Sequence, residues 1–123
     1  MLNPLGVVWV GLYAANLSTL VAFYEHTVGF RVLERDDQCC ILDAGAGALF
    51  EIWGKGFASG SRKSTREQSV LVGFLVERLE PVVEELRSRG LLPETKIESY
   101  LGTRWIYYTD PEGNRFEFKD HHA

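Results

Sequence analysis

The sequence predicts an α+β fold made of two β-α-β-β-β modules, and three observations support this prediction. The chain contains an internal repeat, in which "VWVGLYAANLSTLVAFYEHTVGF" from Val8 matches "VLVGFLVERLEPVVEELRSRG" from Val70. Each copy opens with a β-branched run and continues with a helical spacing of apolar residues that ends at a glycine. Several short strand-like segments, separated by turn residues, follow each copy.

The first copy predicts a helix with one buried face. Its apolar residues recur at the i, i+3, i+4 spacing typical of an amphipathic helix, namely Leu17, Leu20, Val21, Tyr24 and Val28. Ser18 is the expected N-cap, because its hydroxyl can accept a hydrogen bond from a free backbone N–H of the first turn. Gly29 is expected to end the helix, since glycine tolerates the left-handed conformation found there.

The second copy predicts a matching helix. The apolar positions are Leu79, Val82, Val83 and Leu86. Pro81 fits the first turn, where its missing N–H costs no hydrogen bond, and Gly90 is expected to end the helix.

Strands are expected on both sides of these helices. After the first helix they cover residues 30–35, 38–44 and 47–53, and after the second roughly 94–101, 103–109 and 114–118. Residues 110–114, "DPEGN", read as a tight turn. We expect one domain over 1–123, with modules at 5–53 and 70–119. The Gly/Ser-rich segment 54–69 is expected to be a linker or lid.

Strand alternation predicts a curved eight-stranded mixed sheet with a concave cup and with the helices on its outer face. Every second residue of the strands is apolar and suits the helix-covered side, as in Phe116 and Phe118. The opposite side combines aromatic, charged and aliphatic residues. The candidate ligand-binding residues on that side are Trp9, Tyr13, Glu51, Trp53, Leu71, Arg115 and Glu117.

Composition narrows the classes of partner. The formal net charge is −4 and no long basic run exists, which argues against nucleic acid. No apolar run is long enough to span a bilayer and the N-terminus lacks a signal-peptide pattern, so we expect no membrane partner and a cytoplasmic location. Cys39 and Cys40 are neighbours in a strand, point to opposite faces, and are expected to be reduced structural thiols.

The paired modules, together with "AFYEHTVGFRV", "LFEIW" and "DPEGNRFEF", resemble the glyoxalase, bleomycin-resistance and extradiol-dioxygenase superfamily, the vicinal oxygen chelate fold. The resemblance covers nearly the whole chain except the linker. It implies a homodimer whose ligand-binding cups are made from paired modules of one chain or of two. It identifies the fold better than the reaction, because one fold hosts many functions.

Metal-using members of the family resemble one another in four ligand positions, which fall here on Trp9, Glu51, Leu71 and Glu117. Indole and leucine side chains cannot coordinate a metal, so half of the set is missing. Glu51 and Glu117 could hold a divalent ion only together with waters. His26 is on the first helix, facing away from the sheet, and His121 and His122 are in the C-terminal tail. No cofactor is therefore favoured, although a divalent metal stays possible.

Three hypotheses follow for the function. The first is a metal-independent protein that binds a small aromatic or cationic molecule, similar to the bleomycin-resistance branch. Its aromatic residues would stack on the ligand, and Glu51 and Glu117 would share a cup with a cation between them: a metal, Arg104, Arg115 or the ligand. The alternative is a divalent-metal-dependent lyase, isomerase or dioxygenase in which Glu117 is catalytic. The third is a ligand-free structural or regulatory dimer.

Overall fold

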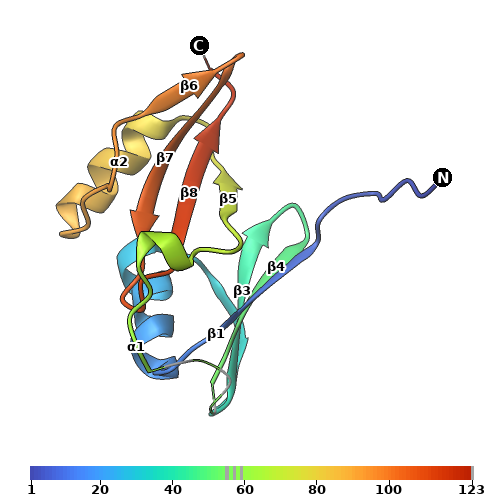
Figure 1. Cartoon of the computed structure of the whole chain (residues 1–123), viewed down its shortest axis with the longest axis vertical. Helices are drawn as coiled ribbons and strands as arrows, with labels where there is room; N and C mark the ends of the chain where they lie inside the picture. The colour runs from blue at the N-terminus through green and yellow to red at the C-terminus, as the bar shows by residue number, and fades with distance from the viewer. Residues whose placement is uncertain (55, 57, 59, 123) are drawn as a thin grey trace.

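The computed structural model describes residues 1–54, 56, 58 and 60–122. Two similar halves follow one another along the chain (Figure 1), and each has a strand, a helix and three more strands. The elements of the first half are β1 (Trp9–Tyr13), α1 (Leu17–Ala22), η1 (Phe23–Val28), β2 (Val32–Arg35), β3 (Cys39–Gly45) and β4 (Ala48–Trp53). Those of the second are η2 (Thr65–Glu67), β5 (Val72–Leu75), α2 (Leu79–Ser88), β6 (Glu98–Tyr100), β7 (Thr103–Thr109) and β8 (Arg115–Asp120).

The predicted α+β class and the two β-α-β-β-β modules are confirmed, but the eight strands form two sheets rather than one continuous sheet. The strand orders are β1-β4-β3-β2 and β5-β8-β7-β6. In each sheet the first strand of the module pairs in parallel with the last, and the other pairs are antiparallel. β1 and β5 are not paired with each other, and residues in β1 and in or just before β5 line a narrow crevice, among them Val10, Leu12, Val70 and Val72.

The first helix begins at a different residue from the one expected. Asn16, not Ser18, is the N-cap, and its Oδ1 accepts a hydrogen bond of 3.2 Å from the Thr19 N–H. The helix continues as a π-helix, η1, in which Tyr24 and Val28 are buried. Gly29 ends it as predicted, in the left-handed conformation with φ of 101°.

The second helix takes its N-terminal partner from a distant strand. Arg78 precedes α2 but caps it with no side-chain hydrogen bond. Instead the Leu79 N–H donates to Asp120 Oδ2 at 2.8 Å, from the end of β8. A carboxylate at a helix N-terminus satisfies a free N–H and interacts favourably with the helix dipole. The sequence separation of 41 between the two partners explains why local sequence reasoning missed this contact.

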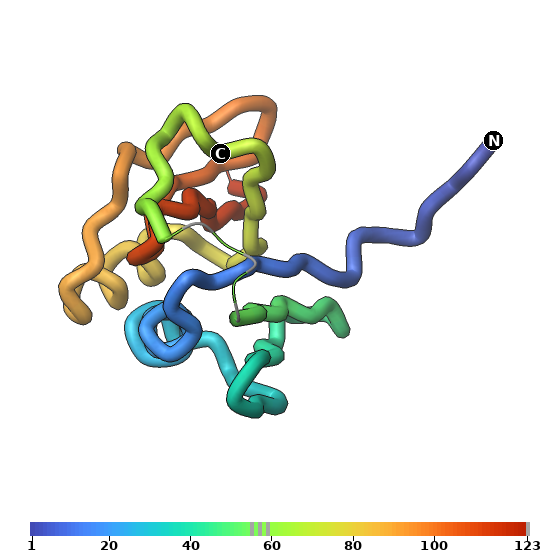
Figure 2. Tube along the Cα trace, turned by 60° about the horizontal axis from the view of Figure 1, so that its bottom comes forward, coloured from blue at the N-terminus to red at the C-terminus, as the bar shows by residue number. Residues whose placement is uncertain are grey.

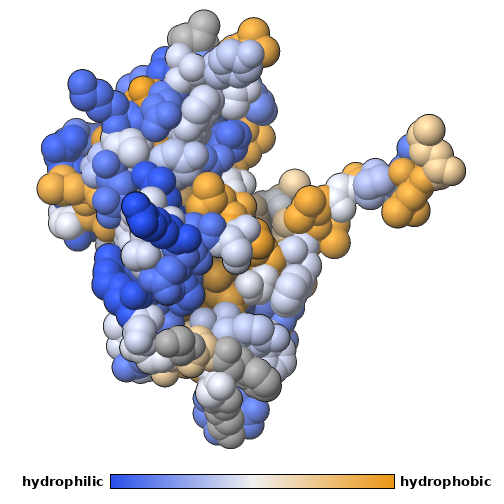
Figure 3. Space-filling model, viewed as in Figure 1, coloured by the Kyte–Doolittle hydropathy of each residue, from blue (hydrophilic) through white to orange (hydrophobic). Residues whose placement is uncertain are grey.

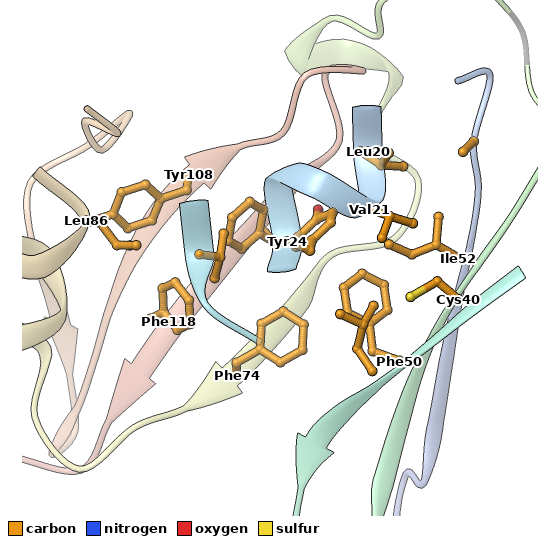
Figure 4. Packing of buried hydrophobic residues seen from close by; sticks show 14 of the residues in the cluster. Leu20, Val21, Tyr24, Cys40, Phe50, Ile52, Phe74, Leu86, Tyr108 and Phe118 are labelled. Atoms are coloured by element: carbon orange, nitrogen blue, oxygen red, sulfur yellow. The ribbon is translucent and has the colours of Figure 1, made fainter. Parts of the chain in front are cut away.

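One apolar core is shared by both modules (Figure 4). The ring centroids of Phe50 in β4 and Phe74 in β5 are 5.7 Å apart. Tyr24 of η1 lies between the sheets, with its ring centroid 4.9 Å from that of Phe50 and 5.5 Å from that of Phe116. Because the helix-side faces of both sheets pack on this core, the opposite face of each sheet points away from it.

Two buried tyrosines in this core provide a matched test of its polar contacts. The Tyr24 hydroxyl donates to Asp110 Oδ2 at 2.8 Å, whereas the Tyr108 hydroxyl has no hydrogen-bond partner among the described residues. We expect Tyr24→Phe to lower the free energy of unfolding by about 2 kcal/mol, because it removes a donor to a buried carboxylate. We expect Tyr108→Phe to be neutral or stabilising, because it removes an unsatisfied hydroxyl.

Chemical denaturation of both variants at neutral pH measures this difference. An equal loss of stability in the two variants would show that the hydrogen bond from Tyr24 to Asp110 adds nothing beyond the removal of a buried hydroxyl.

Part of the predicted linker is tied to the β7–β8 turn. Residues 55, 57 and 59 lie outside the described residues, and we call residues 60–69 the strap. The Arg62 guanidinium donates from Nη1 to the backbone oxygens of Asp110 and Pro111, at 3.2 and 2.9 Å. The Lys63 N–H donates to the Glu112 carbonyl at 3.0 Å, and Gln68 Nε2 donates to the Gly113 carbonyl at 2.7 Å.

The same turn also holds the start of the first helix. The backbone N–H groups of Ala15 and Asn16 each donate to the Glu112 carboxylate at 2.9 Å. The "DPEGN" turn therefore connects the second module to the first helix and to the strap.

The segment before Val8 extends away from the folded body (Figure 2), and its exposed residues Leu2, Leu5 and Val7 make it strongly apolar. Figure 3 shows further apolar atoms gathered where the segment leaves the body. Within the described part of the chain, no helix is long and apolar enough to cross a membrane.

Candidate functional site

The face of the first sheet that points away from the core carries a hollow lined with aromatic rings. We call this surface the first cup face; it holds Trp9, Tyr13, Glu51 and Trp53. With Gly11 and Leu12 these residues line a hollow of 530 Å³. Trp9 is 51% exposed, Tyr13 55% and Trp53 38%, so the rings present about half of their surface to a ligand or partner.

The position of Trp9 depends on the glycine two residues later. The Trp9 indole lies across Gly11, where an alanine Cβ would collide with Cη2 and lie 2.7 Å from Cζ2. Gly11 pairs in register with Glu51, so the indole lies beside this carboxylate. Trp53 Nε1 donates to Glu51 Oε1 at 3.0 Å. Glu51 thus shares the hollow with both indoles, and one of its oxygens already accepts a hydrogen bond from Trp53.

The face of the second sheet that points away from the core combines cations with aromatic rings. We call it the second cup face; it holds Trp105, Tyr107, Arg115, Glu117 and Lys119. Lys119 Nζ lies 3.0 Å from Glu117 Oε1 and 5.1 Å from the Trp105 ring centroid. The Arg115 Cζ lies 4.0 Å from the Tyr107 ring centroid. Both cations are therefore placed for cation–π contacts.

Glu117 is already bound by neighbours on its own face. Burial raises the pKa of Tyr107, and the negative charge of Glu117 and a hydrogen bond to its carboxylate raise it further. The Glu117 and Lys119 side chains lie over Gly73 of the adjacent strand, where an alanine Cβ would be 2.8 Å from Glu117 Oε1. An ammonium and a phenol thus occupy the surroundings of this carboxylate.

The structure places the predicted residues on two faces and not in one hollow. Glu51 lines the first cup face and Glu117 the second, and no hydrogen bond or ion pair between described residues joins them. Leu71 precedes β5, is 45% exposed and does not line the aromatic hollow. Arg104, a candidate cation between the two glutamates, lies instead on the helix side and pairs with Asp120 and Glu80.

Sequence reasoning left open whether Trp105 and Tyr107 or Arg104 and Tyr108 lie on this face, and it did not include Lys119 among the candidate ligand-binding residues. Lys119 shares the parity of Glu117, so the alternation already placed it on this face. Trp105 and Tyr107 needed the register of β7 on β8, which pairs them with Lys119 and Glu117. That register follows from the turn and the core, and the β7 sequence alone leaves both faces open.

The residues present do not fit the metal that the family resemblance implies. No group of three or more histidine, cysteine, aspartate or glutamate side chains that could hold a metal exists in residues 1–54, 56, 58 and 60–122. Of the four family ligand positions, only Glu51 and Glu117 offer donor atoms. Trp53 donates to one of them and Lys119 to the other.

A second hollow, of 540 Å³, lies between the first helix and the β2–β3 turn. Three of its charged groups contact one another, since Glu25 binds Arg35 at 2.6 Å and His26 at 3.2 Å. The aromatic hollow is the better candidate for a ligand site, because its lining is mainly aromatic and its rings are partly exposed.

Comparison with known proteins agrees with this architecture. The family model described as "Glyoxalase/Bleomycin resistance protein/Dioxygenase superfamily" matches residues 6–118. No curated protein matches the sequence.

Solved structures of similar fold include a glyoxalase/bleomycin resistance protein/dioxygenase from Nocardioides. It has a TM-score of 0.77 and 19% identity, over 100% of this chain and 87% of that chain. The lactoylglutathione lyase from Agrobacterium tumefaciens has a TM-score of 0.69 and 19% identity, covering 95% and 94%. TioX from Micromonospora sp. ML1 has a TM-score of 0.73 and 20% identity, covering 94% and 98%. At these identities the likeness concerns the fold alone.

Proposed function

This chain belongs to the glyoxalase/bleomycin resistance protein/dioxygenase superfamily, and on that premise we propose that it is a metal-independent small-molecule-binding protein. The observation that carries the proposal is which side chains occupy the positions that hold the metal ligands in metal-using members of the family. Trp9 fills one of them with an indole, and Glu117 at another is paired with Lys119 at 3.0 Å. An ammonium beside the carboxylate supplies the positive charge that a metal would otherwise supply.

The ligand that suits this site is small, flat and aromatic. Trp9, Tyr13 and Trp53 offer partly exposed ring faces around one hollow of 530 Å³, a volume within the range of small-molecule sites. Glu51 has one oxygen hydrogen-bonded to Trp53, and its second oxygen can accept from a ligand amine or hydroxyl. An aromatic ligand with a hydrogen-bond donor therefore matches the first cup face.

We propose further that a second copy of the chain completes the cup. Large apolar side chains remain exposed along β1 and β5 and next to them, with Trp9 at 51%, Leu71 at 45% and Leu75 at 67%. Apolar surface of this kind on a small domain is typical of an interface. A homodimer would cover it and enclose the aromatic hollow.

The binding proposal is tested by tryptophan fluorescence during titration with indole, benzyl alcohol and a panel of aromatic amines. We expect a saturable change for at least one ligand, and about tenfold weaker binding in Trp9→Leu, because one stacking face is lost. Gly11→Ala should weaken binding as well, since it displaces the same indole. Glu51→Gln should weaken the binding of amines but not of the other compounds. Glu84→Gln, on the exposed side of α2, serves as the matched control.

Elemental analysis after incubation with Zn²⁺, Mn²⁺ or Mg²⁺ tests the metal part of the proposal. We expect substoichiometric metal. Stoichiometric metal that both Glu51→Gln and Glu117→Gln abolish would favour a metal-dependent enzyme. No fluorescence change for any compound would instead favour a structural or regulatory dimer.

Sedimentation velocity tests the dimer. We expect a dimer for the native chain and a shift towards monomer for Leu75→Glu, because a buried charge opposes association. Leu92→Glu is the control, since Leu92 is similarly exposed, at 60%, but lies after α2. A monomer at every concentration would contradict the dimer and leave the binding proposal to be judged by the titrations.

A further inference from the structure

A separate pocket lies where the strap crosses the second sheet. It has a volume of 310 Å³ and is lined by strap residues together with Glu94, Thr109, Gly113 and Arg115. The strap contributes Arg62, Lys63, Ser64, Thr65 and Gln68. This pocket shares only Arg115 with the second cup face and no residue with the aromatic hollow.

The charge of this pocket is opposite to that of the whole protein. Arg62, Lys63 and Arg115 contribute three cations against the single carboxylate of Glu94, whereas the chain carries a net charge of −4. Glu94 forms no salt bridge with them within the described residues, where the ion pairs of the second module involve other carboxylates. A concentration of positive charge in a concave site attracts anions.

Two of the three cations, Lys63 and Arg115, form no hydrogen-bonded ion pair with a carboxylate among the described residues. Arg62 donates to the backbone oxygens of Asp110 and Pro111 and so holds the strap. Lys63 Nζ, in contrast, is buried and has no hydrogen-bond acceptor among the described residues. The Arg115 guanidinium lies over the Tyr107 ring and forms no ion pair with a described carboxylate.

A buried ammonium without an acceptor is energetically unfavourable, and an anion bound beside it would remove this cost. The hydroxyls of Thr65 and Thr109 add neutral donors to the same lining. The strap itself is fixed over the pocket, because Gln68 Oε1 accepts from the Arg115 N–H at 2.9 Å and Gln68 Nε2 donates to the Gly113 carbonyl at 2.7 Å. The cations are therefore held in place before any ligand arrives.

We infer that this pocket is an oxyanion-binding site in which Lys63 and Arg115 bind a carboxylate or phosphate group. Arg115 also belongs to the second cup face. An acid group bound in this pocket can therefore be part of a larger ligand that reaches the second cup face. That last connection rests on the proposed function, whereas oxyanion binding itself does not.

The direct test is isothermal titration calorimetry of the full chain with inorganic phosphate and, separately, with acetate, at constant ionic strength. We expect saturable one-to-one binding of at least one of them, and the comparison identifies which oxyanion is preferred. Lys63→Gln and Arg115→Gln should each weaken binding about tenfold or more, because each removes a charge-assisted hydrogen bond. Arg66→Gln is the matched control: Arg66 is on the same strap, is exposed and does not line the pocket.

Absence of saturable binding, or an equal effect of Lys63→Gln and Arg66→Gln, would overturn the inference. Circular dichroism checks that the variants are folded, and Lys63→Met provides a second neutral replacement. A parallel titration with indole separates the two proposals. Indole binding without oxyanion binding would contradict only the oxyanion-site proposal. Oxyanion binding without indole binding would contradict only the proposal that the aromatic hollow binds a ligand.

Discussion

Replacing Asp120 with alanine is expected to lower the free energy of unfolding by about 3 kcal/mol at neutral pH. The Asp120 side chain is fully buried and accepts four hydrogen bonds, the longest from the His122 N–H at 3.3 Å and three that are shorter. The three shorter bonds come from the Leu79 N–H at 2.8 Å, from Arg104 Nε at 2.9 Å and from Arg104 Nη2 at 2.6 Å. The variant removes the cap of α2 and leaves the largely buried Arg104 without its buried partner.

The exposed member of the same network is the control. Glu80 binds Arg104 at 2.7 Å, but its side chain is 52% exposed, so Glu80→Ala should change stability far less than Asp120→Ala. Chemical denaturation of the two variants and the native chain gives the comparison. Equal losses would show that the ion pair of Arg104 with Glu80 at the surface contributes as much stability as the buried Asp120 cap.

The contribution of Asp120 should also depend on pH. Hydrogen bonds from Arg104 hold the pKa of Asp120 well below its ordinary value and lower that of Glu80 to about 2. Because a lowered folded-state pKa favours the folded state only while the group is ionised, this stabilisation is complete above the ordinary carboxyl pKa of about 4. It is lost as the pH falls further, towards the folded-state values. The difference between the native chain and Asp120→Ala should therefore shrink in denaturation experiments below about pH 4.

Replacing Gly113 with alanine is expected to lower the free energy of unfolding by about 3 kcal/mol and to release the strap. Gly113 has φ of +83°, a conformation that costs an alanine roughly 1–2 kcal/mol. In addition, the new Cβ would collide with the Lys63 carbonyl oxygen and lie 2.7 Å from the Lys63 nitrogen. Both clashing atoms belong to the backbone, so the strap must move.

Gly47→Ala separates the two causes. Gly47 has almost the same φ, +82°, but nothing lies within 4 Å of its added Cβ. This control should lose only the conformational part, about 1 kcal/mol. Limited trypsin digestion checks the strap directly, because Arg62, Lys63 and Arg66 should be cut faster in Gly113→Ala than in Gly47→Ala. Equal cleavage rates would show that contact with Gly113 does not hold the strap.

The repeat and the residue spacing were sufficient to predict the fold class and the two modules, because hydrophobic periodicity is a local property of the chain. The alternation also assigned Glu51 and Glu117 to the faces away from the core, since side chains of a strand point to opposite sides. It failed for contacts between distant residues. The N-cap of the first helix is Asn16 and not Ser18, and the Asn16 N–H donates to the Glu112 carboxylate, 96 residues away in sequence.

The sequence by itself determined which side chains lie outside the core. These include Trp9 and Glu51 in the first module and Glu117 and Lys119 in the second. Only the tertiary structure decided how those faces are arranged. The two sheets share one core around Tyr24 and remain unpaired at β1 and β5, so Glu51 and Glu117 lie on separate faces. Likewise, only long-range packing brings Lys63 of the strap and Arg115 of β8 to the lining of one pocket. Periodicity specifies the face of each element, whereas the position of one face relative to another depends on which apolar surfaces pack together.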